Sequence, residues 1–320
     1  MQFIRDLYAA AAADGRPVLS FEFFTPKTDD GERSFFEKTM PALAALRPGF
    51  CSVTYGAGGS TRDRTLGMVE RIQREFGLPA MAHLTCVGAT RAQITALLSD
   101  ARTRGIQNVL ALRGDPPAGT GSFQKVEGGF QFAHELVTLA RQMGGFSIGV
   151  AGFPEGHLEC RVGKRVDWQR LKAKIDCGAD FVLTQLFFDN AFFYEFRDYL
   201  TSKLGVQVPI VPGIIPIQSA SQVRKFVTLC GATIPSALAA RLDQLADDDA
   251  AAAEFGIEFA AAQCADLLRL GVPGLHFYSL NKAGPVTRIL GQLGLDPEAR
   301  PPGPPSFRLE GPRPTPSLPA

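Results

Sequence analysis

The sequence predicts a closed (β/α)8 barrel of the TIM type, because short strand-like runs alternate with amphipathic helical segments over most of the chain. Eight apolar runs rich in strand-favouring residues follow one another along the sequence. They cover residues 17–24, 50–56, 80–87, 108–115, 147–154, 181–189, 209–216 and 274–281. The chain of 320 residues is longer than the about 250 usual for this fold, and the excess lies before the eighth strand.

The segments between these runs predict helices. Residues 61–77 repeat large apolar side chains at three- and four-residue steps, which is the period of an amphipathic helix. In residues 90–105, Thr90 is placed to cap the first turn and Gly105 to end the helix. Residues 236–271 are long enough for two helices, so we expect an extra helix before strand eight.

An open, doubly wound parallel sheet is the competing architecture, but its nucleotide-binding fingerprint is missing. The stretch GAGGST at 56–61 follows a strand and precedes a helix, yet the GxGxxG pattern needs glycine where Thr61 stands. We interpret 56–61 as a tight turn whose backbone amides are available to a phosphate.

Charge and cysteine content narrow the class of protein. The 33 basic and 32 acidic residues nearly cancel and form no dense basic run, so nothing predicts a nucleic-acid partner. The six cysteines are far apart and make no metal-binding pair, so we expect reduced thiols and no metal. The alanine-rich run 7–13 is too weakly apolar for an export signal and predicts a surface helix. We expect a cytoplasmic protein, outside the membrane, that binds small molecules.

The chain divides into two parts by composition. Residues 1–296 are predicted to form one catalytic domain that holds the whole barrel. From 297 to 320, proline and glycine displace core-forming residues, which predicts a disordered, proline-rich tail.

Polar and aromatic residues follow the ends of the predicted strands, and in a barrel these ends meet at the active-site rim. They are Glu22, Thr54, Tyr55, His83, Thr85, Arg113, Asp115, Phe153, Glu155, Gln185, Tyr278, Asn281 and Lys282. Each has a structural alternative: His83 as a hydrogen-bonded core histidine, Asp115 as a cap in a turn, and Gln185 as a partner for backbone groups. Their joint placement at one rim favours a site.

Glu22 is the most informative of these residues, because it stands among aromatic side chains in LSFEFFTPK, residues 19–27. Desolvating a carboxylate costs several kcal/mol unless it is paired or protonated. Glu22 is therefore either a structural carboxylate paired with an arginine, for which Arg113 is available, or an acid. In the second case, apolar surroundings would raise its pKa and keep it protonated near neutrality.

Eight sequence blocks occur in the order and at the separations of one known family. They are SFEFFTPK, VTYGAGGSTRDRT, AHLTC, LALRGDPP, GFPEGH, LTQLFFD, VPGIIPI and HFYSLNKA. From about residue 17 to residue 290, the chain resembles the bacterial, single-domain 5,10-methylenetetrahydrofolate reductases.

The resemblance implies a barrel with FAD that takes hydride from NADH or NADPH and reduces 5,10-methylenetetrahydrofolate to 5-methyltetrahydrofolate. The two substrates would alternate at one site in a ping-pong cycle, and the protein would be a homo-oligomer. Glu22 matches the family's catalytic glutamate, which would deliver the proton that opens the five-membered folate ring. Asp115 matches an aspartate near flavin and pterin, where its charge would tune the flavin potential.

The resemblance also implies binding residues. For the folate these are Gln185, Phe226, Tyr278 and Lys282, and for FAD they are Thr54, Tyr55, His83, Arg113, Gly114, Asp115, Phe153, His157, Asp167, Arg170 and Lys174. Phe153 stands where the family has tyrosine, and Lys282 where arginine is usual, so a hydroxyl and a bidentate donor are lost. Arg170 and Ala173 stand where asparagine and arginine are expected, which changes the expected adenine and diphosphate contacts.

Two rival functions remain open at this point. One is a flavin-free, pterin-binding barrel that transfers a methyl or pterin group, and the other is a non-catalytic folate-binding barrel. A corrinoid or zinc-thiolate methyltransferase would need clustered cysteine or histidine ligands, which the sequence lacks.

Overall fold

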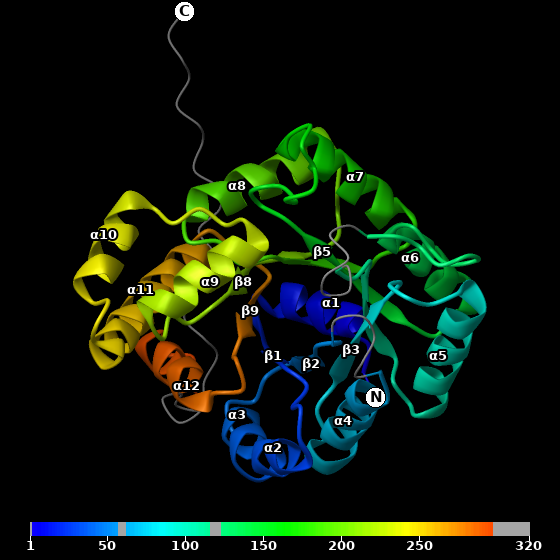
Figure 1. Cartoon of the computed structure of the whole chain (residues 1–320), viewed down its shortest axis with the longest axis horizontal. Coiled ribbons are helices and arrows are strands. Elements are labelled where there is room, and N and C mark those ends of the chain that lie inside the picture. The colour runs from blue at the N-terminus through cyan, green and yellow to red at the C-terminus, as the bar shows by residue number, and fades with distance from the viewer. Residues whose placement is uncertain (1, 57–61, 116–122, 297–320) are drawn as a thin grey trace, which may run out of the picture.

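The protein, described by a computed structural model over residues 2–56, 62–115 and 123–296, is a barrel of parallel strands surrounded by helices (Figure 1). The strands are β1 Val18–Phe23, β2 Phe50–Val53, β3 Ala80–Thr85, β4 Asn108–Leu112, β5 Ser147–Gly152, β6 Phe181–Thr184, β7 Ile210–Val211, β8 Gly213–Ile214 and β9 Gly274–Tyr278. Their order in the sheet is β7-β6-β5-β4-β3-β2-β1-β9-β8. The predicted barrel is confirmed, and the open doubly wound sheet is excluded.

The barrel closes through one short strand that is interrupted by proline. β7 pairs with β6 and β8 pairs with β9, and only Pro212 separates β7 from β8. Proline has no N–H to donate to a ladder, but the Pro212 carbonyl accepts the N–H of His276 at 3.0 Å. Residues 210–214 are therefore the predicted seventh strand, and β9 is the predicted eighth.

Helices cover the outside of the barrel and one of its ends. They are α1 Ile4–Asp14, α2 Asp29–Ser34, α3 Met40–Ala44, α4 Arg62–Phe76, α5 Arg91–Thr103, α6 Ala133–Met143, α7 Lys164–Asp176, α8 Asn190–Asp198, α9 Ala220–Cys230, α10 Ser236–Gln244, α11 Asp249–Arg269 and α12 Ala283–Gln292, with π-helical segments η1 Phe35–Thr39 and η3 Tyr199–Lys203. Two helices, α10 and α11, precede the last strand as predicted. Thr90 caps α5 in a capping box with Gln93, and Gly105 follows α5 in the left-handed conformation, also as predicted.

The apolar core has an outer and an inner part. The outer part lies between the strands and helices and includes the stripe of α4, with Leu66, Val69 and Ile72 fully buried. The inner part fills the barrel below the rim, where Phe50, Leu110 and Phe181 join the first helix. The predicted tail, 297–320, and most of the GAGGST stretch, 57–61, lie outside the described residues.

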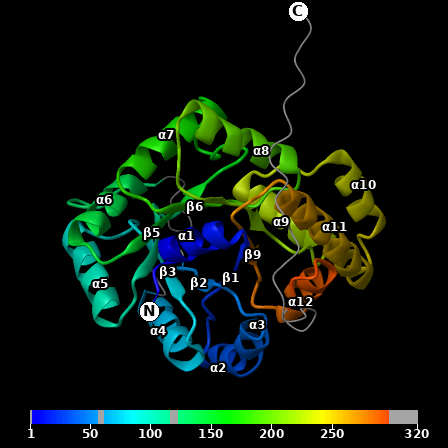
Figure 2. The ribbon, with the colours of Figure 1, turned by 180° about the vertical axis from the view of Figure 1, so that it is seen from behind.

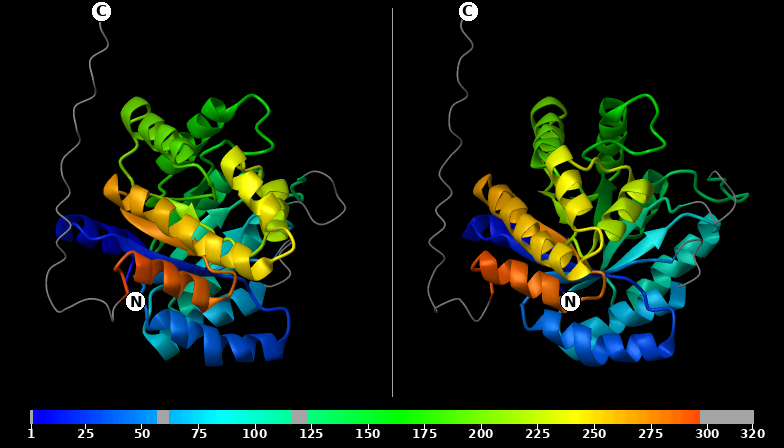
Figure 3. Two further views of the ribbon diagram at one scale, coloured as in Figure 1. Left: turned by 90° about the vertical axis from the view of Figure 1, so that its left-hand side faces the viewer. Right: turned by 60° about the vertical axis from the view of Figure 1, so that its left-hand side comes forward.

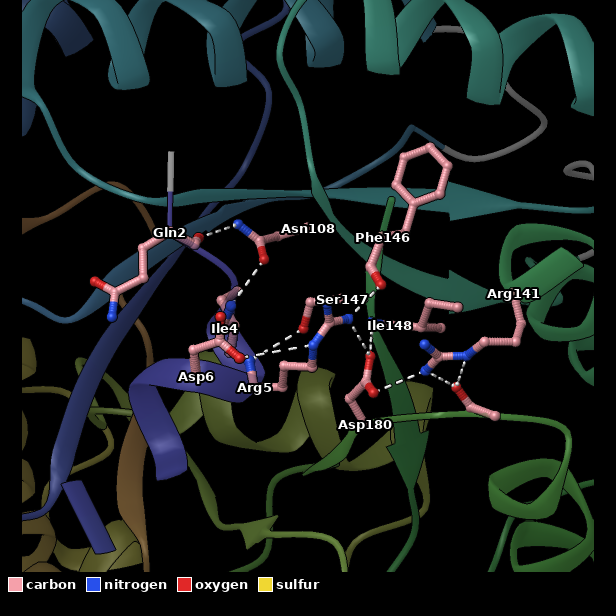
Figure 4. Close-up of polar contacts among 11 residues, drawn as sticks. Gln2, Ile4, Arg5, Asp6, Asn108, Arg141, Phe146, Ser147, Ile148 and Asp180 are labelled. Carbon is pink, nitrogen blue, oxygen red and sulfur yellow. Dashed lines mark hydrogen bonds and ion pairs between the residues drawn. The ribbon is translucent and has the colours of Figure 1, made fainter. Parts of the chain in front are cut away.

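The first helix is not a simple surface helix, and that prediction was wrong in part. Figures 2 and 3 show α1 across the end of the barrel where the strands begin. Two strand-start residues hold it there: Asn108 accepts the N–H of Ile4 at 2.9 Å, and Ser147 Oγ accepts the N–H of Arg5 at 3.1 Å (Figure 4). The Arg5 guanidinium donates to the Phe146 carbonyl at 2.7 Å. The alanine run thus forms the outer face of a plug.

Tyr8 is the residue of α1 that contacts the aromatic side chains inside the barrel. Its side chain is 2% exposed and packs against Phe50 and Phe181, with ring centroids 6.2 and 5.8 Å apart. Among the described residues, no group hydrogen-bonds to its hydroxyl. A buried polar group without a partner costs folding free energy.

Replacing Tyr8 by phenylalanine is therefore expected to stabilise the protein by about 1 kcal/mol, since the ring packing stays and an unpaired hydroxyl is removed. Thermal or urea unfolding of the full chain measures this change. Tyr194→Phe is the matched control, because the Tyr194 hydroxyl donates to Asp266 and its loss should lower the stability. A lower melting temperature for Tyr8→Phe would contradict the assignment.

Candidate functional site

Glu22 faces the inside of the barrel. Side chains alternate along a strand, and Val18, two steps before Ser20 and four before Glu22, belongs to the inner core. The flanking Phe21 and Phe23 belong to the outer core, so the aromatic neighbours that dominate the sequence point away from the carboxyl. The carboxyl is 11% exposed and lies near the rim.

Two histidine rings contact the Glu22 carboxyl. Nε2 of His83, from β3, and Nε2 of His276, from β9, each lie 3.2 Å from Oε2 of Glu22. Ser52 Oγ, from β2, is 3.4 Å from the same oxygen. The predicted alternative of an arginine partner is wrong, because Arg113 binds elsewhere.

The protonation expected for Glu22 must also be corrected. Burial by itself raises the pKa of this carboxyl, but the charge of His83 and the hydrogen bond and charge of His276 outweigh burial and lower the pKa to about 2. Without a ligand, Glu22 is therefore an ionised carboxylate. The sequence suggested the opposite, because Phe21 and Phe23 flank Glu22 in the chain and the histidines do not.

A chain of polar contacts continues from Glu22 into the barrel. Nδ1 of His276 lies 2.8 Å from the hydroxyl of Ser20, and that hydroxyl is 3.3 Å from the Leu275 carbonyl. A neutral ring with its proton on Nε2 donates to Glu22 and accepts from Ser20, whereas a protonated ring donates at both ends. His276 can therefore hold or release a proton beside Glu22 without leaving a partner unsatisfied.

A second group of charges lies over the ends of β4 and β5. Arg113 donates to both carboxylate oxygens of Glu159, at 2.6 and 2.8 Å. Gly114 follows with a φ of 88°, where a side chain is strained. Asp115 is exposed next to them. The Arg113–Glu159 pair connects the end of β4 to the loop between β5 and α7.

That loop brings together the residues predicted around Phe153. The rings of Phe153 and His157 meet edge to face with centroids 4.6 Å apart, and the His157 N–H donates to Asp167 at 3.1 Å. Nζ of Lys174 donates to the Ala151 carbonyl at 2.8 Å. Arg170, which like Asp167 and Lys174 lies on α7, directs its guanidinium to Cys160 Sγ at 3.5 Å.

The titratable groups of this loop and of α7 are poorly solvated. Burial lowers the pKa of Lys174 to about 8, with Asp167 partly opposing the shift. Burial also raises the pKa of Asp167 and lowers that of His157. Groups of both signs that are each pushed toward neutrality are typical of a functional site that takes a polar ligand.

The described residues fit the FAD that the sequence leads one to expect. The Thr85 hydroxyl is buried and has no hydrogen-bond partner among the described residues. A Cβ on Gly114 would come within 2.9 Å of Thr85 Cβ and 2.8 Å of Val87 Cγ1, so only glycine fits against these two side chains. The Thr85 hydroxyl without a partner and the poorly solvated charges at Asp167 and Lys174 are features of a site for a ring system with a charged extension.

The residues predicted to hold the substrate come from the end of β6, from α9, and from the end of β9 and the segment that follows it. The Tyr278 hydroxyl donates to the Thr184 carbonyl at 2.6 Å, and burial raises its pKa. Gln185 Oε1 accepts the N–H of Leu186 at 2.8 Å, so this amide does satisfy a strand-end group. Phe226, on α9, is half-buried in a separate apolar cluster. Lys282 donates to Gln218 Oε1 at 2.5 Å.

The remaining predicted residues close the rim near β2. Thr54 accepts the Thr25 hydroxyl at its carbonyl oxygen, at 2.7 Å. The Tyr55 hydroxyl accepts a hydrogen bond from Arg62 at 2.8 Å. These contacts order the chain on both sides of the β1–β2 seam.

The sequence did not predict several residues of the site. Ser20 and His276 share a barrel face with Glu22 and Tyr278 at two-residue spacing, so strand alternation was the signal that could have found them. Glu159 follows His157 by two residues. The side-chain amides of Gln218 and Gln222 carry buried nitrogens without partners among the described residues, and nothing local in the sequence marks them.

The described residues contain no group of three or more histidine, cysteine, aspartate or glutamate side chains arranged to hold a metal ion.

A parallel barrel whose strand ends carry a buried carboxylate–histidine cluster and a second cluster of groups with shifted pKa values is the architecture of a barrel enzyme. The family model for methylenetetrahydrofolate reductase matches residues 7–294. The chain belongs to the methylenetetrahydrofolate reductase family.

Relatives from bacteria and plants agree with this membership. The Escherichia coli 5,10-methylenetetrahydrofolate reductase is 37% identical over 287 residues, which cover 90% of this chain and 94% of that protein. Methylenetetrahydrofolate reductase (NADH) 1 of Arabidopsis thaliana is 41% identical over 305 residues, covering 92% of this chain and 51% of the relative. The chain thus spans about half the length of the plant relatives it matches.

Solved structures support the fold. A protein from Clostridium thermocellum, described as binding two copies of 5-methyl-5,6,7,8-tetrahydrofolic acid, aligns with a TM-score of 0.62 at 13% identity. The alignment covers 92% of this chain and 99% of that one.

Among the helices of the described ranges, none has the length and apolar character needed to cross a membrane.

Glu22→Gln is expected to weaken the dependence of stability on acid pH. The pKa of Glu22 falls from 4.5 to about 2 on folding, so the ionised carboxyl stabilises the folded state fully above about pH 4.5, and this stabilisation is lost as the pH falls toward 2. Between about pH 6 and pH 3, the wild type should lose about 2 kcal/mol more unfolding free energy than the variant. Urea unfolding at several pH values measures this, with the exposed Glu37→Gln as control. Parallel curves for wild type and Glu22→Gln would exclude the shift.

Proposed function

We propose that this protein reduces 5,10-methylenetetrahydrofolate to 5-methyltetrahydrofolate, with FAD as cofactor and NADH or NADPH as reductant, in a ping-pong cycle. The observation that carries the proposal is the Glu22 carboxylate at the rim, held between two histidines. Family membership and the relatives' names support the folate substrate. The proposal includes a cytoplasmic, homo-oligomeric enzyme. The first point rests on the sequence features given above, and the second rests on the family resemblance alone.

When bound, FAD would supply the redox chemistry, accepting hydride from the nicotinamide and giving it to the folate. Thr85, Gly114 and His83 would border its ring at the ends of β3 and β4. Arg113, His157, Asp167, Arg170 and Lys174 would hold its charged extension. Lys174 and Arg170 are the cations available for a diphosphate, and the Arg113–Glu159 pair would fix the loop beside it.

Glu22 would act as the proton donor that opens the folate ring. Because its carboxyl is ionised without a ligand, the proton must reach Oε2 through a neighbour. His276 Nε2, 3.2 Å away, is placed to supply it, and Ser20 can follow by turning its hydroxyl. Water exclusion by the bound substrate would raise the affinity of Glu22 for this proton.

The part of the rim at the ends of β6 and β9 would hold the folate. Gln185 and Tyr278 would border the pterin, and Phe226 would pack on its flat face. Lys282, which donates to Gln218 Oε1, is a cation suited to a carboxylate. The amide nitrogen of Gln218 has no partner among the described residues and is a second available donor. This arrangement supports the expected role of Lys282 in spite of its difference from arginine.

Colour tests the proposal directly. The purified full chain, supplied with FAD, should be yellow. Under anaerobic conditions NADH or NADPH should bleach it, and methylenetetrahydrofolate should restore the colour. Comparison of the two nicotinamides identifies the reductant. A colourless protein that binds folate without bleaching would support one of the rivals, a flavin-free methyltransferase or a folate-binding barrel, and would overturn the reductase.

The two half-reactions separate the role of Glu22. Glu22→Gln should keep the bleaching by NADH near the wild-type rate, because that step needs no proton from the carboxyl. Recovery with methylenetetrahydrofolate should slow by about 10²- to 10⁴-fold, the usual contribution of a general acid. Stopped-flow absorbance measures both steps. The control is Glu254→Gln on α11, and a normal recovery in Glu22→Gln would exclude the proposed role.

A further inference from the structure

An aromatic ring stands exposed at the mouth of the barrel, immediately after β1. Phe24 is 44% exposed, whereas Phe21 and Phe23 before it are fully buried. Among the described residues, no aromatic ring packs against Phe24. An exposed phenylalanine two residues after Glu22 has no role in the core.

The backbone hydrogen bonds fix the direction of this ring. The Phe23 carbonyl accepts the N–H of Thr54, toward β2, and both backbone groups of Phe24 bond on the other side, toward the segment after β9. This alternation is that of an extended strand, so Phe24 continues β1 by one step. Its side chain therefore leaves the same face as Glu22 and lies above the carboxyl, toward the mouth.

The partner of Phe24 is a side chain rather than a strand. Oδ1 of Asn281 accepts the Phe24 N–H at 2.9 Å, and Nδ2 of Asn281 donates to the Phe24 carbonyl at 2.8 Å. Two residues earlier, the Glu22 carbonyl accepts the N–H and the hydroxyl of Ser279, at 3.3 and 2.6 Å. The Asn281 amide thus takes the place of the next peptide group in the β1–β9 ladder.

Two residues adopt an unfavourable backbone conformation to make this contact. Leu280 and Asn281 have φ values of 53° and 56°, in the left-handed region that asparagine tolerates and leucine avoids. Strained backbone of this kind persists where the surrounding structure or function requires it. The Thr39 hydroxyl, from η1, lies 3.3 Å from the Asn281 carbonyl and holds the turn from the other side.

The next residue is fixed as well. The Thr25 hydroxyl donates to the Thr54 carbonyl at 2.7 Å. The backbone that carries Phe24 is therefore held from both neighbouring strands while its ring stays exposed. A ring that is fixed before a ligand arrives loses little freedom on binding.

We propose that Phe24 is a substrate-binding residue, whose ring forms a wall of the reaction site above Glu22 and packs against a planar heteroaromatic ring, and that Asn281 is its positioning residue. The inference rests on the proposed function, which brings two such rings to this place, the pterin of the folate and the nicotinamide.

Steady-state kinetics of the full-length enzyme test Phe24. Phe24→Leu keeps an apolar side chain but removes the aromatic face, and KM for the ring that packs on Phe24 should rise about 10-fold. A rise for methylenetetrahydrofolate alone identifies the pterin, and a rise for the nicotinamide alone identifies that ring. Phe24→Tyr should restore the wild-type KM. Leu270→Ala, at the end of α11, is the control, with a similarly exposed apolar side chain (41%) before β9 begins.

A double-mutant cycle tests Asn281. Asn281→Gly tolerates the positive φ but lacks the amide, so it should raise the same KM as Phe24→Leu, while Asn281→Asp keeps the acceptor for the Phe24 N–H and should have a smaller effect. The double variant Phe24→Leu with Asn281→Gly should match Phe24→Leu alone, since Asn281 acts through the ring.

The outcomes separate this inference from the proposed function. An active wild type in which Phe24→Leu leaves both KM values unchanged, or lowers kcat only, would overturn the role of Phe24. Additive effects of the two substitutions would overturn the role of Asn281. A wild type that never reduces methylenetetrahydrofolate would instead overturn the proposed function and, with it, the inference.

Discussion

The contact between the Glu22 carboxylate and two histidine rings is the interaction on which the site depends. Its three members come from β1, β3 and β9, which are distant in sequence and meet only in a closed ring of strands. The short strand around Pro212 completes that ring, because its carbonyl accepts the N–H of His276 itself. Closure of the barrel and the charge state of Glu22 are therefore consequences of the same pairing. A carboxylate taken from water at this depth needs such partners to stay ionised.

One end of the barrel contributes to stability, and the other end carries the polar groups of the site. At one end α1 covers an apolar interior, and Asn108 and Ser147 anchor it with hydrogen bonds to its first turn. At the other end the strands stop below a rim of polar side chains, many of them with shifted pKa values. The same strands connect the two ends. The apolar layer that contains Phe50 and Phe181 therefore lies directly below the Ser20–His276–Glu22 contacts inside the barrel.

Electrostatics differ between the two sides of the rim. Around Glu22, opposite charges outweigh burial, and the carboxyl is held ionised. Around Asp167 and Lys174, burial is the larger effect, and both groups are pushed toward their neutral forms. The first arrangement suits a proton relay that works within the protein. The second suits a site completed by a ligand that brings its own charges.

Much of the architecture could be predicted from the sequence, because strand and helix periodicities are local and survive in any context. They gave the eight strands, the extra helix before the last strand, the cap at Thr90 and the placement of Glu22 at a strand end. The sequence did not reveal how Glu22 is protonated, since His83 and His276, which decide it, are distant from Glu22 along the chain, the second by 254 residues. Nor did it reveal that Arg113 binds Glu159, or that the alanine-rich helix closes the barrel. Such contacts depend on which strands become neighbours, and only the closed tertiary structure determines that.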